Sequence, residues 1–206
     1  MAKLRFGLYG TYIGDEFDSS SALTLDQMQV NAKYIYTYLA ARGWTKNAIA
    51  GLLGNMQVES SINPGRWQSD RVGGDSSGHG YGLVQWTPYT IYTEWVSGDP
   101  STMDNNLSRI IYEIENNLQW IGVGDFAGMS FRDFSTSLLS PYELGRAFIL
   151  CYERPADQSS EAQAYRGSLA SSWFEYLSGV NPTPTSKKKK KNFKFVLFNK
   201  RRVLNG

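Results

Sequence analysis

One carboxylate, Glu59, stands at the end of a predicted apolar helix and at the start of a polar loop. The helix carries apolar side chains at helical spacing, namely Ile49, Leu52, Leu53 and Met56. Partial burial and the negative end of a helix dipole both favour the protonated form of a carboxyl group. A carboxylic acid that keeps its proton near neutral pH is the general acid needed to cleave a glycosidic bond. On spacing alone a solvated surface glutamate is favoured, so the neighbouring residues must decide.

A second carboxylate is the next group to look for. A water-activating base lies roughly 6.5–9.5 Å from the acid in an inverting glycosidase, and a nucleophile lies roughly 5–5.5 Å away in a retaining one. Asp70 and Asp75 are the local candidates in the loop 61–80, although either residue can simply form a turn. The chain has one histidine, His79, and one cysteine, Cys151. We therefore expect no zinc site of the usual kind, no internal disulfide and no cofactor.

Helical periodicity predicts the elements that position these side chains. We expect helices at 25–41, 46–60, 89–96, 104–120, 130–138, 141–152 and 161–177. Thr24 and Thr45 are suited to cap the first two of them. Gly51 and Gly54 lie on one helix, which indicates close helix packing or a wall beside a groove. A short extended segment at 80–88 is the small β element that we expect.

Composition and charge divide the chain into three parts. Its 206 residues with 41% hydrophobic content predict one domain of ordinary size. We place an N-terminal extension at 1–24, a helical domain at 25–180 and a basic segment at 181–206. Nine of the 21 Lys and Arg residues follow position 180 and all 19 Asp and Glu precede it, so residues 1–180 carry a net charge of −7. This split suggests that the basic segment has its own partner. We find no signal-peptide core and no membrane span.

Several short segments, in order along residues 25–178, resemble the phage tail lysozyme family. That family belongs to the lysozyme superfamily and is found at the tail tips of short-tailed phages that infect Gram-positive hosts. The matching segments are NAKYI at 31–35, GWTK at 43–46, GNMQVES at 54–60, INPG at 62–65, GLVQWTP at 82–88 and YERP at 152–155. Several ordered segments are far more specific than any single motif. The resemblance implies a mainly α, lysozyme-like fold with a small β element beside the active-site cleft.

The resemblance also implies roles for single residues. Glu59 is then the catalytic acid, and Gln85 borders the sugar-binding groove. A glutamine amide offers a donor and an acceptor, which suits an N-acetyl group. Tyr81 and Trp86 are candidates to stack on sugar rings, although core packing is at least as typical of such aromatic residues. Tyr152, at the end of a predicted helix, is a candidate to hydrogen-bond Glu59 or an acetamido group.

Two residues of the last matching segment are expected to be structural. We expect Glu153 and Arg154 to form an ion pair or a helix cap rather than to take part in catalysis. Related tail-tip proteins can carry a second domain, a zinc endopeptidase. Because this chain lacks the zinc ligands, we expect a module that cleaves glycan only.

Together these features predict a virion-associated glycosidase of the lysozyme or muramidase type. This hydrolase would cleave peptidoglycan between N-acetylmuramic acid and N-acetylglucosamine at the tail tip and so open the host cell wall for genome ejection. Two alternatives stay open: a lytic transglycosylase, in which the substrate's own N-acetyl group participates, and an inactive tail-tip or plug protein with a lysozyme-like fold. We expect the segment 181–206 to dock onto other phage tail proteins, since a run of five lysines gives only non-specific electrostatics and indicates no specific nucleic acid.

Overall fold

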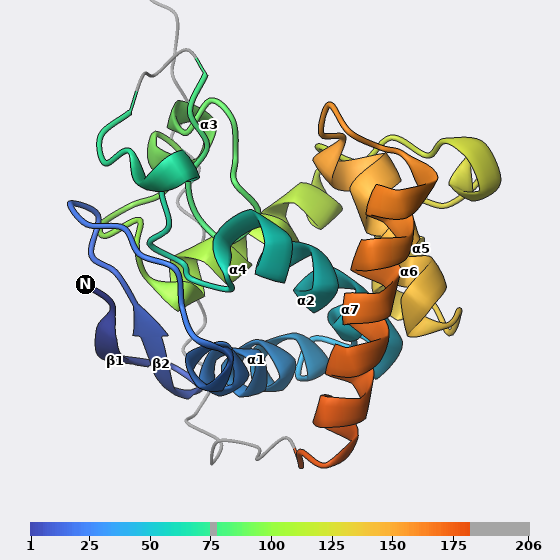
Figure 1. Ribbon diagram of the computed structural model, residues 1–206, viewed down its shortest axis with the longest axis horizontal. Coiled ribbons are helices and arrows are strands. Elements are labelled where there is room, and N and C mark those ends of the chain that lie inside the picture. Colours follow the sequence, from blue (N-terminus) through green and yellow to red (C-terminus); the bar gives the residue numbers. More distant parts are fainter. Residues whose placement is uncertain (75–77, 182–206) are drawn as a thin grey trace, which may run out of the picture.

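Helices dominate the part of the chain that the computed structural model describes, residues 1–74 and 78–181 (Figure 1). The strands and α-helices are β1 (Lys3–Gly7), β2 (Gly10–Gly14), α1 (Leu25–Ala40), α2 (Lys46–Ser60), α3 (Thr90–Thr93), α4 (Met103–Glu115), α5 (Phe131–Thr136), α6 (Pro141–Phe148) and α7 (Ser160–Ser178). Short turns of other helix types are the 3-10 helices η1 (Gln68–Asp70) and η2 (Gly124–Phe126) and the π-helix η3 (Ile149–Glu153). This architecture confirms the expected mainly α fold.

Some expectations fall outside this part of the chain. Asp75 and the predicted basic anchor, apart from residue 181, are not among the described residues. Within residues 1–74 and 78–181, no helix is both long enough and apolar enough to cross a lipid bilayer.

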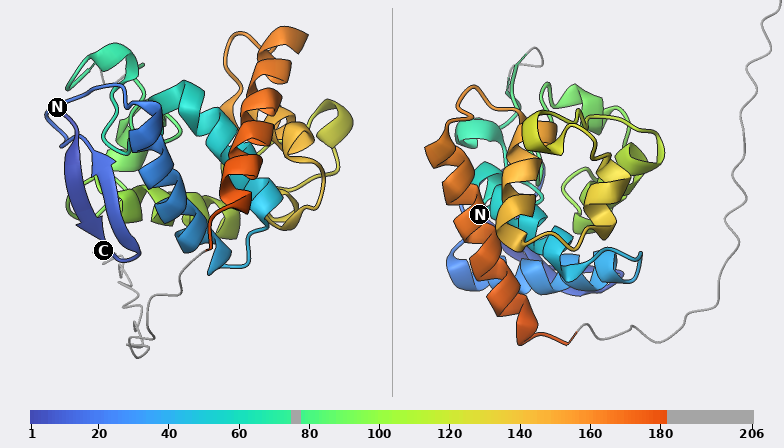
Figure 2. Two further views of the ribbon diagram at one scale, coloured as in Figure 1. Left: turned by 60° about the horizontal axis from the view of Figure 1, so that its bottom comes forward. Right: turned by 90° about the vertical axis from the view of Figure 1, so that its right-hand side faces the viewer.

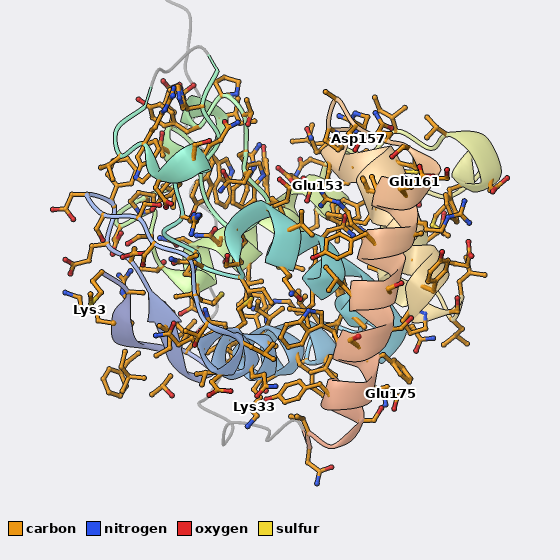
Figure 3. All side chains as sticks on the ribbon, viewed as in Figure 1. Lys3, Lys33, Glu153, Asp157, Glu161 and Glu175 are labelled. Atoms are coloured by element: carbon orange, nitrogen blue, oxygen red, sulfur yellow. The ribbon has the colours of Figure 1, made fainter. Side chains whose placement is uncertain are left out.

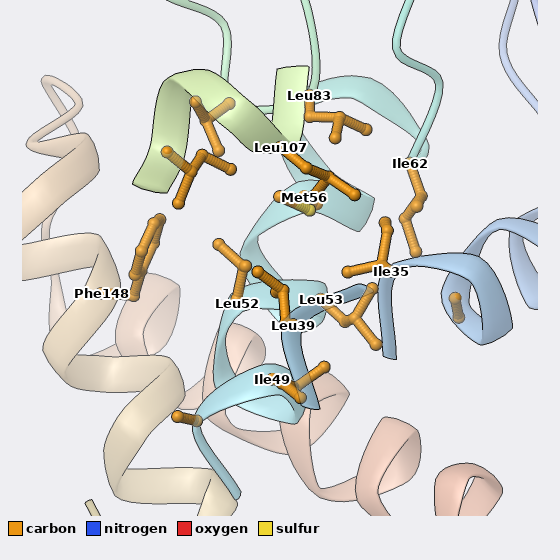
Figure 4. Packing of buried hydrophobic residues seen from close by; sticks show 14 of the residues in the cluster. Ile35, Leu39, Ile49, Leu52, Leu53, Met56, Ile62, Leu83, Leu107 and Phe148 are labelled. Carbon is orange, nitrogen blue, oxygen red and sulfur yellow. The ribbon is translucent and has the colours of Figure 1, made fainter. Parts of the chain in front are cut away.

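Helix α2 lies at the centre of the fold. Every residue from Ala48 to Met56 is buried, a pattern typical of a helix that other elements surround. Helices α1, α6 and α7 pack against it, and Figure 4 shows Leu52, Leu53 and Met56 among side chains from neighbouring helices. The core therefore fixes the last turn of α2, which carries Glu59.

The N-termini of α1 and α2 form as expected. The Thr24 hydroxyl accepts the Gln27 N–H while the Gln27 side chain accepts the Thr24 N–H, which completes a capping box. Thr45 caps α2 in the same way through its hydroxyl. At the other end of α2, Ser61 adopts a left-handed φ of 54°, and its N–H bonds one of the last helical carbonyls. The chain thus leaves the helix two residues after Glu59.

Helix α4 differs from the expectation at both ends. Its N-cap is Thr102, whose hydroxyl accepts an N–H of the first turn, so Asp104 lies inside the helix instead of capping it. The helix ends at Glu115 rather than near residue 120. The reason is that Asn117 and Gln119 adopt left-handed φ angles of 52° and 67°, which a right-handed helix cannot contain.

Glycines let α2 approach α6 and α7 closely, as the sequence indicated. A Cβ atom at Gly51 would lie 2.8 Å from the Cβ of Leu144 in α6, and one at Gly54 would lie 2.8 Å from the carbonyl oxygen of Arg166 in α7. Gly145 in α6 also approaches the Arg166 carbonyl so closely that a Cβ there would lie 2.8 Å from it. These helices meet backbone to backbone, which brings α7 against the end of α2.

The predicted N-terminal extension contains the two-stranded sheet. Strands β1 and β2 form an antiparallel hairpin, which Figure 2 shows beside α1. Tyr12 is buried, and the backbone N–H and carbonyl of Ile13 each bond the Asn31 side chain of α1 at 2.7 Å. The hairpin is thus attached to the helical body by core packing and by buried hydrogen bonds.

The segment 80–88, where a β element was expected beside the site, forms a tight turn. Tyr81 and Trp86 make an isolated bridge, and no longer ladder forms there within the described residues. Between them the chain reverses, because Gly82 and Gln85 adopt left-handed φ angles of 86° and 50°. The two-stranded sheet of the fold is the N-terminal hairpin, and the β element beside the site consists of two isolated bridges, Trp67–Tyr81 and Tyr81–Trp86.

Candidate active site

A cleft of about 540 Å³ opens where four segments of the chain meet. Its lining comes from the end of α2, the loop around Arg66, the turn around Gln85 and the residues that follow η3, beginning at Glu153. Glu59 and Gln85 both belong to this lining, so the predicted acid and the predicted groove residue face one cleft. Figure 3 shows Glu153 between α2 and the N-terminal end of α7.

An arginine from α7 holds the Glu59 carboxylate. The Nη2 atom of Arg166 lies 2.6 Å from Oε1 of Glu59, with 8% of the arginine side chain and 19% of the glutamate side chain exposed. The Nη1 atom of Arg166 donates to Oδ1 of Asn55 at 3.1 Å. Asn55 is fixed in turn, because its Nδ2 donates to the carbonyls of Gly51 and Gly145. A chain of buried polar contacts therefore orients Glu59 from behind.

The helical spacing of α7 contains a signal for the buried position of Arg166. Arg166 shares a helical stripe of α7 with Ala170, Trp173 and Leu177, and all four residues are buried. A charged residue at a core position of a helix needs a partner of opposite charge. Periodicity reveals such a position, but it does not identify Glu59 as the partner, because the two residues belong to distant parts of the chain.

Gln85 lines the cleft, and only the oxygen of its amide is left unpaired by the protein. Its Nε2 donates to the carbonyls of Arg66 and Gly82 at 3.1 Å and 2.9 Å. Its Oε1 is buried and has no hydrogen-bond partner among the described residues. Arg66 itself lines the cleft, where Nη2 pairs with Asp70 at 3.1 Å and Nη1 is buried without a partner in the described chain.

Glu153 also lines the cleft, while Arg154 has the capping role that we expected, since it is the C-cap of η3 and its N–H bonds the Ile149 carbonyl. The expected ion pair with Arg154 is not formed, because the Arg154 guanidinium donates to the carbonyls of Gln119 and Cys151. The Oε1 atom of Glu153 is buried and has no hydrogen-bond partner in the part of the chain that the structure describes. Burial raises the pKa of the Glu153 carboxyl well above its usual range, and the negative charge of Glu59 raises it further.

The unpaired polar atoms concentrate at this one place. Among the described residues, four buried side-chain polar atoms lack a hydrogen-bond partner, and three of them belong to residues that line the cleft: Arg66, Gln85 and Glu153. Unpaired buried polar groups are costly in a folded protein. Their gathering in one cleft indicates a site built to be completed by a polar ligand.

The three aromatic residues that we considered for sugar binding are buried instead. Tyr81, Trp86 and Tyr152 are at most 3% exposed, and none of them lines the cleft. Trp86 Nε1 and Tyr152 Oη both donate to the carboxylate of Glu113 in α4, at 2.8 Å and 2.5 Å. The structure therefore places them behind the site, where they join the turn at 80–88 to α4 and η3.

Glu113 was not singled out from the sequence. It accepts a third hydrogen bond, from Nε of Arg109 at 2.9 Å, so both of its oxygens are used. Burial still raises the pKa of its carboxyl, against the lowering effect of Tyr152 and Arg109.

The two aspartates proposed as the second carboxylate have different outcomes. Asp70 is half-exposed, pairs with Arg66 and accepts the Ser20 hydroxyl at 2.7 Å, and it is not part of the cleft lining. Asp75 lies outside the described residues. Within residues 1–74 and 78–181, no group of three or more His, Cys, Asp or Glu side chains is placed to hold a metal ion.

The chain is similar to known phage proteins. A family model described as phage tail lysozyme matches residues 30–177. Morphogenesis protein 1 of Bacillus phage B103 is 45% identical over 170 residues, which cover 81% of this chain and 44% of that protein. The chain thus corresponds to less than half the length of this relative. The match over most of the helical domain shows that the chain belongs to the phage tail lysozyme family.

Proposed function

We propose that the protein is a peptidoglycan glycosidase of the virion, with Glu59 as its general acid. It cleaves the glycan backbone between N-acetylmuramic acid and N-acetylglucosamine. The observation that carries this proposal is the position of Glu59 in a polar cleft whose lining holds three unpaired buried atoms. A glycan strand, with hydroxyl and acetamido groups along its length, supplies partners for such atoms.

The contacts of Glu59 suggest how it delivers its proton. Arg166 binds Oε1, so the proton for the glycosidic oxygen belongs on Oε2. A carboxylate held from behind by a fixed guanidinium loses little orientation when the substrate binds, and this preorganisation lowers the barrier. As the proton moves to the glycosidic oxygen, the bond from that oxygen to C1 breaks. Water or the N-acetyl group of the substrate then attacks C1.

Gln85 and Arg66 are suited to position the sugar. The free Oε1 of Gln85 can accept an acetamido N–H, because both donor hydrogens of its amide point to backbone carbonyls. The free Nη1 of Arg66 can donate to a hydroxyl or a carboxylate oxygen of the strand. Both groups then gain the hydrogen bonds that they lack in the free protein.

The family and the relative support a place in the phage particle. The matched family is described as phage tail lysozyme, and the relative from phage B103 is described as a morphogenesis protein. We propose that the protein is a tail component, located at the tail tip, that opens the host cell wall locally when the genome is ejected. Residues 181–206 would attach it to neighbouring tail proteins.

The test compares the wild-type protein with Glu59→Gln on purified cell walls of a Gram-positive host. Glutamine keeps an oxygen for Arg166 but cannot donate the acid proton. Glu175→Gln in α7 is the matched control, since Glu175 is exposed and does not line the cleft. We expect clearing by wild type and by the control, and none by Glu59→Gln. Equal clearing by all three proteins contradicts the mechanism.

Mass spectrometry of the released fragments identifies the reaction. Hydrolysis leaves reducing sugar ends, whereas a lytic transglycosylase leaves 1,6-anhydro ends. A wild-type protein that binds walls but releases neither product would instead indicate the structural alternative, a tail protein with a lysozyme-like fold and no activity.

A further inference from the structure

The chain turns sharply at Glu153, and the turn separates two neighbouring side chains. The π-helix η3 ends with a bond from the Arg154 N–H to the Ile149 carbonyl at 2.9 Å, and Arg154 adopts a left-handed φ of 47°. Tyr152 is buried against Glu113, whereas the next residue, Glu153, lines the cleft. Such π-turns inside helical segments occur often at functional sites.

The surroundings of Glu153 do not stabilise an ionised carboxylate. Its Oε1 is buried and unpaired within the described chain. The adjacent Arg154 guanidinium donates its hydrogen bonds to backbone carbonyls instead. The charged groups that act on it are Glu59 from α2, Arg166 from α7, Glu113 from α4 and Arg154 beside it. Both glutamates favour its protonated form, and both arginines oppose it. Burial is the largest effect, and it favours the protonated form.

Charge balance in the cleft favours a single shared proton. Arg166 carries one positive charge, and the ionised Glu59 that it binds carries one negative charge. A second ionised carboxylate in the same cleft would be uncompensated, whereas one proton carried by either Glu59 or Glu153 leaves the three groups neutral.

We propose that Glu153 is the second carboxyl group of the catalytic centre and that it holds, together with Glu59, the one proton delivered to the glycosidic oxygen. This inference rests on the proposed function. Glu153 acts through Glu59 and is a positioning residue. It retains the proton at a pH where Glu59, which is paired with Arg166, would otherwise have no proton to deliver. Its role differs from that of the base or nucleophile for which Asp70 and Asp75 were the candidates.

The proton balance of the reaction closes with this pair. The pair gives its proton to the leaving oxygen as the bond from that oxygen to C1 breaks. A water molecule adds its oxygen to C1, and its spare proton returns to the pair, which restores the starting state. When a hydroxyl group of the sugar itself attacks C1, the proton of that hydroxyl returns in the same way.

The experiment measures initial cleavage rates of the full chain on purified walls as a function of pH. The proteins are wild type, Glu153→Gln, Glu153→Asp, Glu59→Gln and the exposed control Glu175→Gln. We expect Glu153→Gln to lose about 100-fold in rate, within the range for assisted proton transfer. We also expect the alkaline limb of its pH profile to move to lower pH, because the buried carboxyl that retains the proton is gone. Glu153→Asp should recover part of the rate and move the limb back.

A second measurement does not depend on how the Glu153 variants fold. Carbon-13 NMR follows the side-chain carboxyl titration of Glu153 in wild type and in Glu59→Gln. We expect the Glu153 carboxyl to titrate at higher pH than exposed glutamates, and its midpoint to fall when the Glu59 charge is removed.

The outcomes separate this inference from the proposed function. If Glu153→Gln matches wild type in rate and pH profile while Glu59→Gln is inactive, the inference is wrong and the proposed function stands. The inference is equally wrong if Glu153 titrates with the exposed glutamates. If the wild-type protein releases no sugar ends, the proposed function fails and the inference fails with it.

Discussion

Two carboxyl groups, those of Glu113 and Glu153, form two acidic centres on either side of the η3 turn. They differ in the hydrogen bonds that their oxygens accept. Glu113 accepts hydrogen bonds from Trp86, Arg109 and Tyr152, so its carboxylate is fully occupied by the protein. Glu153, whose neighbour Tyr152 belongs to the first centre, has a buried oxygen without a partner among the described residues. Burial raises the pKa of both carboxyls.

The contrast shows that burial and a raised pKa do not by themselves mark a functional carboxyl group. A buried carboxylate whose oxygens are all satisfied holds elements together, and its removal costs stability. A buried carboxyl group left incomplete beside a cleft costs stability as long as the site is empty, and it can gain partners from a ligand. The following variants test whether the two centres separate in this way.

The largest effect is expected for Glu59→Gln. The cleavage rate should fall about 1,000-fold, a loss typical of removing a general acid. The unfolding temperature should fall less than for Glu113→Gln: Arg166, 8% exposed, also loses its counter-charge, but the glutamine oxygen can still accept from it and Glu59 is 19% exposed where Glu113 is 1% exposed. A thermal melt and a wall-clearing assay on the same sample check both parts. A large loss of stability would place Glu59 with the structural centre instead.

Glu113→Gln should show the opposite behaviour. Arg109 would be left buried without a counter-charge, and one of three hydrogen bonds to a charged acceptor would weaken, for a loss of about 3 kcal/mol of unfolding free energy. Urea unfolding measures this loss. At a temperature where the variant is folded, its cleavage rate should stay within a few-fold of wild type. A loss of activity without a loss of stability would contradict the division.

A smaller effect is expected where α7 meets α2. A Cβ atom at Gly54 would lie 2.7 Å from the Ala170 nitrogen and 2.8 Å from the Arg166 carbonyl oxygen. Gly54→Ala should therefore lower the unfolding free energy by about 2 kcal/mol and also reduce the rate, because α7 must shift and carry Arg166 with it. Gly128→Ala is the matched control, since a Cβ there meets nothing within 4 Å. Equal stability of the two variants would show that this contact is not tight.

The smallest effect concerns the pH dependence of stability. A carboxyl group with a raised folded-state pKa contributes stability that is fully present below its unfolded-state pKa of about 4.5 and is lost as pH rises through its folded-state value. Relative to wild type, Glu153→Gln should therefore become more stable as pH rises from about 4.5 towards the folded-state value, and the difference should level off above it. Unfolding temperatures of both proteins from pH 4 to 8 check the slope. An unchanged difference across this range would show that Glu153 titrates alike in both states.

Much of the helical fold could be predicted from the sequence because helix formation depends on local patterns. Apolar spacing and the threonine caps located α1 and α2, and the glycines Gly51 and Gly54 indicated the close helix contact that the structure contains. The expectation that Glu59 and Gln85 share a groove came from family resemblance, and the structure places both in one cleft.

The rest depends on contacts between distant residues, which local patterns do not contain. The partnership of Glu59 with Arg166 needs the packing of α7 on α2. The exposure of Glu153 to the cleft needs a π-turn, for which the helical spacing of 141–152 gave no sign. Trp86 and Tyr152 were ambiguous because an aromatic residue with a polar tip suits a groove and a buried hydrogen bond equally well.

The link between α2 and α7 has a consequence for the synthesis of the protein. Arg166 binds Asn55, which precedes it by 111 residues, and it also holds Glu59. While the chain is being made, the α2 segment emerges long before the arginine that must orient its carboxylate. Until α7 has left the ribosome and docked, the cleft lacks the cation behind Glu59. The candidate site is thus completed by α7, so a partly synthesised chain would carry Glu59 without the arginine that orients it.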